Sequence, residues 1–409
     1  MRWRLRNRLR ELAEASIWPI PVAITVAAFL LADATIAVDA ANDDAVLIFD
    51  PTTATALLAA IAAAMITFTG FVFSVLLLVV QFASGQFTPR VLRTAYRDRL
   101  TQVALGIFVG TFVYTLNVLS EIRDEAVPTF AVSVAILFVL ISVILFIALV
   151  SRVSKSMRAP RIADTVVRDG LDAIARTCGP HGGPDAPGRA LPADADDKVA
   201  AEETGILRAV DRRGLARLAR NAGAEIELRR AVGDHLGRGT PLFIVRGGEI
   251  PAARLRRRVI VADERAIGDD PLFALRIVVD IAARALSPGV NDPTTAVQAI
   301  DRVQTLLEAL VDRDLPGGDV CDGDGSPLLR EPQPTWGDVL ELGIDEIATY
   351  GADSEQVMRR LRALLADLTV LAPPGERREA TRARLAALGE SAPADWQGLG
   401  LARPLALAD

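Results

Sequence analysis

Four long apolar stretches fill the first 150 residues and constrain the fold of this chain more than any other feature. They cover residues 17–38, 54–82, 102–120 and 128–150. Each is long enough to cross a hydrocarbon core of roughly 30 Å as a helix of about 20 residues. A spanning segment must satisfy its backbone hydrogen bonds internally, so α-helix is the expected form. The sequence therefore predicts an α-helical membrane protein with four transmembrane helices.

Charge alternates between the gaps around these stretches. Arginines precede the first stretch and follow the second and fourth, whereas the other two gaps are dominated by Asp and Glu. Because loops rich in Lys and Arg stay in the cytoplasm, both termini are expected on the cytoplasmic side of a bacterial inner membrane. Lys155 and Lys198 are the only lysines, an arginine bias typical of a GC-rich genome. A cleaved signal peptide at the N-terminus is the alternative, and it would leave three spans and place the polar half outside.

The segment after the membrane stretches begins with an expected helix over 161–177 and a loop over 178–197 that is rich in Gly, Pro, Ala and Asp. A small β module should follow, because short apolar runs then alternate with turn residues. The turn from Val232 to Leu242 resembles that of lipoyl and biotinyl carrier domains, but no lysine stands on a neighbouring hairpin, so no covalent cofactor is expected. The expected elements are strands 205–210, 224–229, 242–245 and 258–262, with a helix over 211–221 capped by Asp211.

Helical periodicity dominates from Pro271 onward. Asp292 is the expected N-cap of the second helix, and Pro293 occupies its first position. Residues 317–326 are acidic and glycine-rich and are expected to form a loop. The fold class is thus a four-helix membrane protein with a cytoplasmic α+β region, in which a small β module precedes a helical domain. The expected helices are 271–286, 293–312, 336–350, 354–370 and 376–388.

These elements predict six parts of the chain. They are a basic N-terminus (1–16), the transmembrane domain (17–150), a helix with a flexible linker (151–198), the β module (199–265), the helical domain (266–390) and a loose C-terminal tail (391–409).

Three segments carry a resemblance to a known family. The run from Arg284 to Ala296, which reads RALSPGVNDPTTA, is the strongest. Residues 86–93 and 106–114 add to it. Together they are similar to a family of predicted bacterial membrane proteins, domain of unknown function 2254. The resemblance covers most of the chain and implies that the chain is a member of this family. It implies no biochemical activity, because none is assigned to the family.

The corner between the first two helices of the helical domain is the first candidate site. A capped turn explains it structurally, whereas a subunit interface or a ligand site is the functional alternative. An anion at the helix start is disfavoured, because Asp292 already places negative charge there. The candidate residues are Arg284, Ser287, Gly289, Asn291, Asp292, Thr294 and Thr295.

The second candidate site lies in the membrane spans, which hold few charges apart from Asp33 near an outer end. Small polar side chains in the second span are expected to pack against other helices, and a pore-lining face is the alternative. Two glycines four residues apart in the third span favour close helix packing. The candidate residues are Thr67, Thr69, Ser74, Gln81, Gly106 and Gly110.

Composition limits the functions that remain. The net charge of −6 disfavours nucleic acid as a partner. Cys178 and Cys321 should be free thiols in the cytoplasm, and no metal, cofactor or catalytic group is expected. Besides the lipid bilayer, self-association is expected. Three hypotheses stay open: an oligomeric channel-like protein for small solutes with a cytoplasmic gate or vestibule, a membrane-anchored scaffold or sensor that binds a ligand or protein, and a lipid-acting enzyme.

Overall fold

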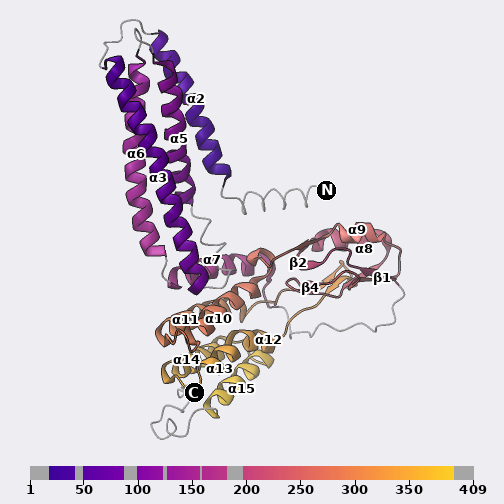
Figure 1. The fold of residues 1–409 in the computed structure, drawn as a ribbon. Helices are drawn as coiled ribbons and strands as arrows, with labels where there is room; N and C mark the ends of the chain where they lie inside the picture. The colour runs from indigo at the N-terminus through magenta and orange to yellow at the C-terminus, as the bar shows by residue number, and fades with distance from the viewer. Residues whose placement is uncertain are drawn as a thin grey trace. The chain divides into compact units, whose positions relative to one another are not determined.

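The computed structural model describes residues 18–41, 49–86, 99–122, 127–156, 159–181 and 197–390. The chain divides into two compact units (Figure 1). The first contains the membrane helices, and the second contains the chain from Ala159 onward. The parts predicted for residues 1–16 and 391–409 lie outside the described residues.

The membrane unit consists of four long helices, as predicted (Figure 1). All four are long and apolar enough to cross a bilayer. Half of the apolar window of the third helix is buried, against 22–28% in the others, so this helix forms the centre of the unit. The helices are α2 (Pro19–Ala41), α3 (Pro51–Gln86), α5 (Arg99–Glu121) and α6 (Thr129–Ser156).

Glycine allows α2 to approach α5 closely. A Cβ atom at Gly106 would lie 3.0 Å from Cα of Pro21 and 2.9 Å from Cδ1 of Ile24. A Cβ atom at Gly110 would lie 3.2 Å from that of Ala28. The small-residue spacing therefore serves helix packing within one chain.

Hydrogen bonds join three helices near one end of the bundle. The Asp39 carboxylate accepts the backbone N–H groups of Phe130 and Ala131, at 3.0 and 2.9 Å, and thereby caps α6. The buried Tyr114 hydroxyl lies 2.8 Å from the Thr35 hydroxyl and donates to the Ala131 carbonyl at 3.0 Å. The carboxylate from α2 thus satisfies two N–H groups at the start of α6, and the hydroxyl from α5 adds a bond to a carbonyl of the same turn.

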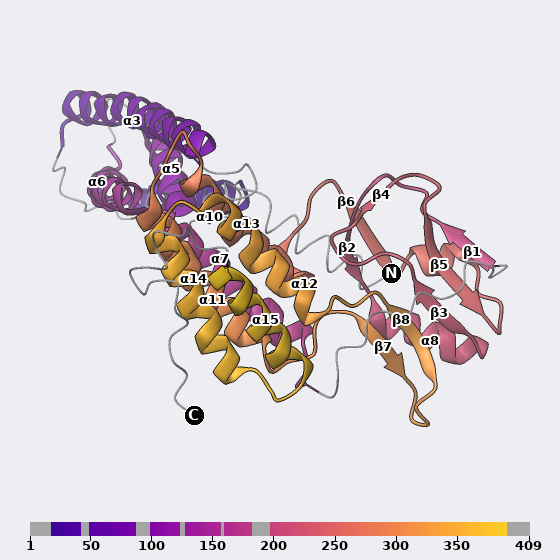
Figure 2. The same ribbon diagram turned by 90° about the horizontal axis from the view of Figure 1, so that it is seen from below.

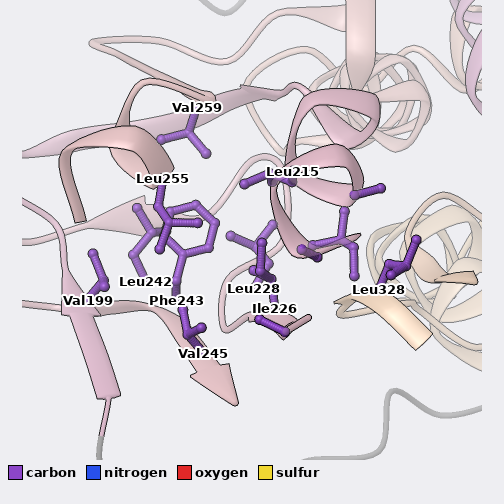
Figure 3. Packing of buried hydrophobic residues seen from close by; sticks show 14 of the residues in the cluster. Val199, Leu215, Ile226, Leu228, Leu242, Phe243, Val245, Leu255, Val259 and Leu328 are labelled. Atoms are coloured by element: carbon purple, nitrogen blue, oxygen red, sulfur yellow. The ribbon is translucent and has the colours of Figure 1, made fainter. Parts of the chain in front are cut away.

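Two small sheets and two helices form the β module of the second unit. One sheet has the order β1-β5-β3-β8-β7 and the other β4-β2-β6. Their core gathers apolar side chains from both sheets and from α8, among them Leu215, Ile226 and Phe243 (Figure 3). The elements are β1 (Asp197–Ala200), β2 (Gly205–Val210), α8 (Arg212–Ala222), β3 (Glu225–Leu228), β4 (His235–Leu236), β5 (Pro241–Arg246), α9 (Ala252–Arg256) and β6 (Val259–Ala262).

The expectation of a loop over 317–326 was wrong. β7 (Gly318–Cys321) and β8 (Pro327–Glu331) form a hairpin, and β8 pairs in parallel with β3. Leu328 and Leu329 are buried in the core of the module, which explains why this short run becomes a strand. The sheet therefore extends beyond the range 199–265 in both directions, because β1 begins at residue 197.

The helical part follows the predicted helices closely, and its members lie side by side (Figure 2). The predicted helix over 336–350 contains a π-helical turn, η2, at its centre. The elements are α7 (Ala159–Thr177), η1 (Ile267–Asp269), α10 (Pro271–Leu286), α11 (Pro293–Leu310), α12 (Trp336–Leu340), η2 (Glu341–Asp345), α13 (Glu346–Tyr350), α14 (Glu355–Leu371) and α15 (Glu376–Glu390).

Contacts along α7 fix its direction against its neighbours. The Arg176 guanidinium donates to the Gly268 carbonyl just before α10. Six residues earlier, a Cβ at Gly170 would meet Ala274 of α10 and Leu306 of α11. Residue numbers thus fall along α7 as they rise along α10, so these two helices are antiparallel.

Candidate functional site

The corner between α10 and α11 is built around an N-cap, as predicted. The Asp292 carboxylate accepts the Thr295 backbone N–H at 3.0 Å and also the Thr295 hydroxyl proton. Pro293 occupies the first helical position. The hydrogen bonds from Thr295 hold the pKa of Asp292 below its usual range. The first turn of α11 therefore already holds a negative charge of the chain itself, which argues against an anion there.

Backbone hydrogen bonds make this corner tight. The Ser287 carbonyl accepts the N–H groups of Val290 and Asn291, at 3.0 and 2.9 Å, and the Ala285 carbonyl accepts that of Asp292 at 2.7 Å. Asn291 has φ 48°, the only positive φ of a non-glycine residue in the described ranges. Asn tolerates this left-handed conformation better than most residues. The corner is thus one rigid turn.

The structure brings the seven candidate residues of the corner together. Arg284, Gly289, Asn291 and Thr294 are exposed, and the other three are half-buried. The side chain of Val290, at the apex, is 50% exposed. The corner therefore offers a surface for contact rather than a cavity for a ligand.

The candidate residues of α3 divide between two faces. Thr67, Ser74 and Gln81 are exposed and recur at seven-residue spacing, so they share one outward face. Thr69 is half-buried. The hydroxyls of Thr67 and Ser74 donate to carbonyls one turn earlier on the same helix, both at 2.9 Å. Each hydroxyl oxygen can still accept a hydrogen bond from another partner.

Sequence reasoning missed the polar groups inside the bundle, which belong mainly to α5. Gln102, Thr111 and Thr115 are buried, and the Thr111 hydroxyl lies 3.3 Å from that of Ser142 on α6. Gln102 lies one turn from Gly106, and Thr111 lies one turn from Thr115, but these two pairs fall on opposite sides of α5, so no single polar stripe marks them in the sequence. Apolar side chains fill the rest of the described interior in two clusters.

An ion pair buried beneath α8 was also missed. The Arg212 guanidinium donates to the Glu331 carboxylate at 2.8 Å. The Glu331 side chain is 3% exposed, and its second oxygen accepts no hydrogen bond. Burial raises the pKa of Glu331, and the nearby Arg212 opposes this shift. No pattern in the sequence distinguishes this glutamate from a surface one.

The two cysteines are free thiols, as expected. Cys321 is exposed on β7, and Cys178 is buried after α7, where burial raises the pKa of its thiol. His181 Nδ1 lies 3.4 Å from the Asp314 carboxylate. Within the described ranges, no group of three His, Cys, Asp or Glu side chains is arranged to hold a metal ion.

The turn that resembles carrier domains has a structural partner. Gly233 has φ 100°, and a Cβ there would lie 2.6 Å from the Arg265 guanidinium. Arg265 in turn donates twice to Asp270, the N-cap of α10, at 2.7 and 2.9 Å. The turn thus packs against the residue pair that starts the helical part.

Comparison with known proteins places this architecture in a family. Residues 14–367 match the family described as predicted membrane protein (DUF2254). The chain belongs to this family. Uncharacterized proteins of Mycobacterium bovis and Mycobacterium tuberculosis are each 32% identical to it over 351 residues, which cover 82% of this chain and 67% of each relative. No solved structure matches the chain.

Proposed function

We propose that this membrane protein assembles into an oligomer in the bacterial inner membrane and forms a path for small solutes between its copies. The outward face of α3 lines that path, and the second unit acts as a vestibule or gate. Both termini lie in the cytoplasm in this arrangement, since the basic segments flank the same ends of the four helices.

The polar outward face of α3 carries this proposal. Thr67 and Ser74 are exposed within the stretch Pro51–Val75, which is apolar enough to cross a membrane, and the exposed Gln81 follows this stretch on the same helix. Gly70 lies on the same face, and a Cβ there would meet nothing within 4 Å. Polar groups that face lipid gain little, whereas the same groups are useful against another helix or against water. Phe71 is also exposed beside them, so the face is mixed, and its polar positions suit contact with another helix or with water.

The packed interior of the bundle explains why the path is assigned to the space between copies. Phe68 packs edge-on against Phe108 and at a tilt against Phe146, with ring centroids 5.4 and 4.4 Å apart. Tyr114 and Phe138 close the other half of the bundle at 5.1 Å. Large side chains thus fill the described interior of one chain, which leaves the surface of α3 as the better candidate lining.

Substitutions on α3 test the path. Thr67→Val and Ser74→Val remove acceptors from the outward face and should lower the single-channel conductance of the purified protein severalfold in planar bilayers. Thr69→Val is the matched control, because Thr69 is half-buried and its hydroxyl donates to the Met65 carbonyl of its own helix.

The outcomes separate path from anchor. A ring in mild detergent with conductance that responds to the first two variants supports the path. A monomer with no conductance under voltage, tension or solute gradient would sink it.

The packed interior also favours a second candidate, a membrane-anchored scaffold or sensor. In that case the rigid corner at Arg284 and Asp292 serves as the contact for a ligand or protein partner. Affinity capture from native membranes should then recover a partner that Arg284→Ala and Asp292→Ala lose. Recovery of the same partner with both variants would count against the corner as the contact.

A further inference from the structure

The α10–α11 corner lies at the end of the helical part where α7 begins. α7 and α10 are antiparallel, and α7 and α11 are parallel, because Asp164 pairs with Arg302 at 3.0 Å while Gly170 faces Leu306. Ala159, the first residue of α7, lies eleven residues before Gly170. The last turn of α10 lies eleven residues after Ala274, which Gly170 faces. The start of α7 and the corner are therefore neighbours.

The start of α7 is tied closely to the last membrane helix. α6 ends at Ser156 and α7 begins at Ala159, so three peptide steps join them, or at most about 11 Å of extended chain. The sequence around this connection is basic, with Arg152, Lys155, Arg158 and Arg161. Basic residues next to a membrane helix attract anionic lipid headgroups, by about 1 kcal/mol each.

The apex of the corner presents an apolar side chain on a rigid turn. Val290 is the most exposed large apolar residue of the corner, at 50%, and exposed Pro288 and Gly289 precede it. The turn cannot fold Val290 inward without breaking the hydrogen bonds that Val290 and Asn291 donate to Ser287. An apolar apex of this kind fits the boundary between headgroups and acyl chains.

We infer that the α10–α11 corner rests on the bilayer, with Val290 at the level of the headgroups of an anionic phospholipid surface. The short connection after α6 keeps this end of the helical part near the membrane, and the basic connection holds the anionic lipid there. The contact with lipid requires neither a path nor an anchor role of the membrane unit.

Val370 offers a matched control at the other end of the helical part. α14 runs parallel to α11, because Arg360 pairs with Asp301 near its start and Asp367 accepts a hydrogen bond from Gln304 further along. Val370 follows at the end of α14 and is 64% exposed. Asp367 lies level with Gln304, eleven residues into α11, so at least about 16 Å of that helix separates the end of α14 from the corner at 1.5 Å per residue.

Site-specific quenching tests the inference on the full chain. A fluorophore is attached to Val290→Cys or to Val370→Cys, each in a Cys321→Ser background, because Cys178 is buried and unreactive toward bulky reagents. The proteins are reconstituted in nanodiscs of phosphatidylglycerol and phosphatidylcholine that contain a headgroup-labelled nitroxide lipid. Quenching at residue 290 should exceed that at residue 370 about twofold or more.

Two results would overturn the inference. Equal quenching at the two positions would place the corner away from the lipid. A spin label at residue 290 that shows short-range dipolar coupling between copies would assign the apex to a second copy instead. Circular dichroism and gel filtration of each labelled variant establish that it is folded before the comparison is made.

Discussion

A single carboxylate closes the turn between α10 and α11. Asp292 accepts two hydrogen bonds from Thr295 and leaves Asn291 in a left-handed conformation beside it. Such a cap stabilises a helix start because it satisfies an N–H group that has no partner within the helix. The residue type at position 292 is thus determined by the start of α11, whatever the corner contacts.

Replacement of this cap should destabilise the protein measurably. Asp292→Ala should lower the free energy of unfolding by about 1 kcal/mol, whereas Asp292→Asn, which can still accept the Thr295 N–H, should lose less. Because the pKa of Asp292 is lowered in the folded protein, its contribution is present at neutral pH and is lost as the pH falls below about 4. Thermal unfolding followed by circular dichroism at pH 7 and pH 3.5 measures both effects. An Ala variant as stable as the wild type at pH 7 would show that the cap is redundant.

Helix packing depends on glycine where two elements meet closely. At Gly170 of α7, a Cβ would lie 2.7 Å from that of Ala274 and 2.9 Å from Leu306 Cδ2. Gly170→Ala should therefore cost roughly 1–3 kcal/mol of stability through overpacking. Gly268→Ala is the control, since a Cβ there meets nothing within 4 Å. Equal urea midpoints for the two variants would contradict the close packing of α7.

The helices could be predicted from the sequence because each carries its own signal. Apolar length marks the membrane helices, and Asp292 with Pro293 marks the start of α11. The strand β8 has no such signal, because its five residues form a strand through pairing with β3 and β7, and β3 is distant in the sequence. Likewise, Gly106 indicated packing, but its partner helix α2 could not be read from the chain. The sequence alone therefore did not predict which distant segments contact each other.

At the scale of the whole molecule, the four membrane helices and the basic segments that flank them predict that the second unit lies on the cytoplasmic side of the membrane. Cys321 is exposed on β7 and provides a natural reporter of sidedness. A membrane-impermeant maleimide should leave Cys321 unlabelled in intact cells and label it after permeabilisation. Asp44→Cys in a Cys321→Ser background is the outward control and should be labelled in intact cells. Labelling of Cys321 in intact cells would instead favour a cleaved N-terminal segment and three spans.

The parallel pairing of β8 with β3 also sets an order of events during synthesis. β3 leaves the ribosome before α10 and α11, and its neighbour β8 emerges only after both of these helices. One edge of β3 therefore has no strand partner until β8 has been synthesised. The membrane helices precede both strands in the chain, so they can hold the nascent protein at the bilayer during this time. Long-range strand pairing of this kind is slow to form, so the β module completes late. A chain that stops before residue 327 would carry the membrane anchor, but it would leave the sheet without one of its inner strands.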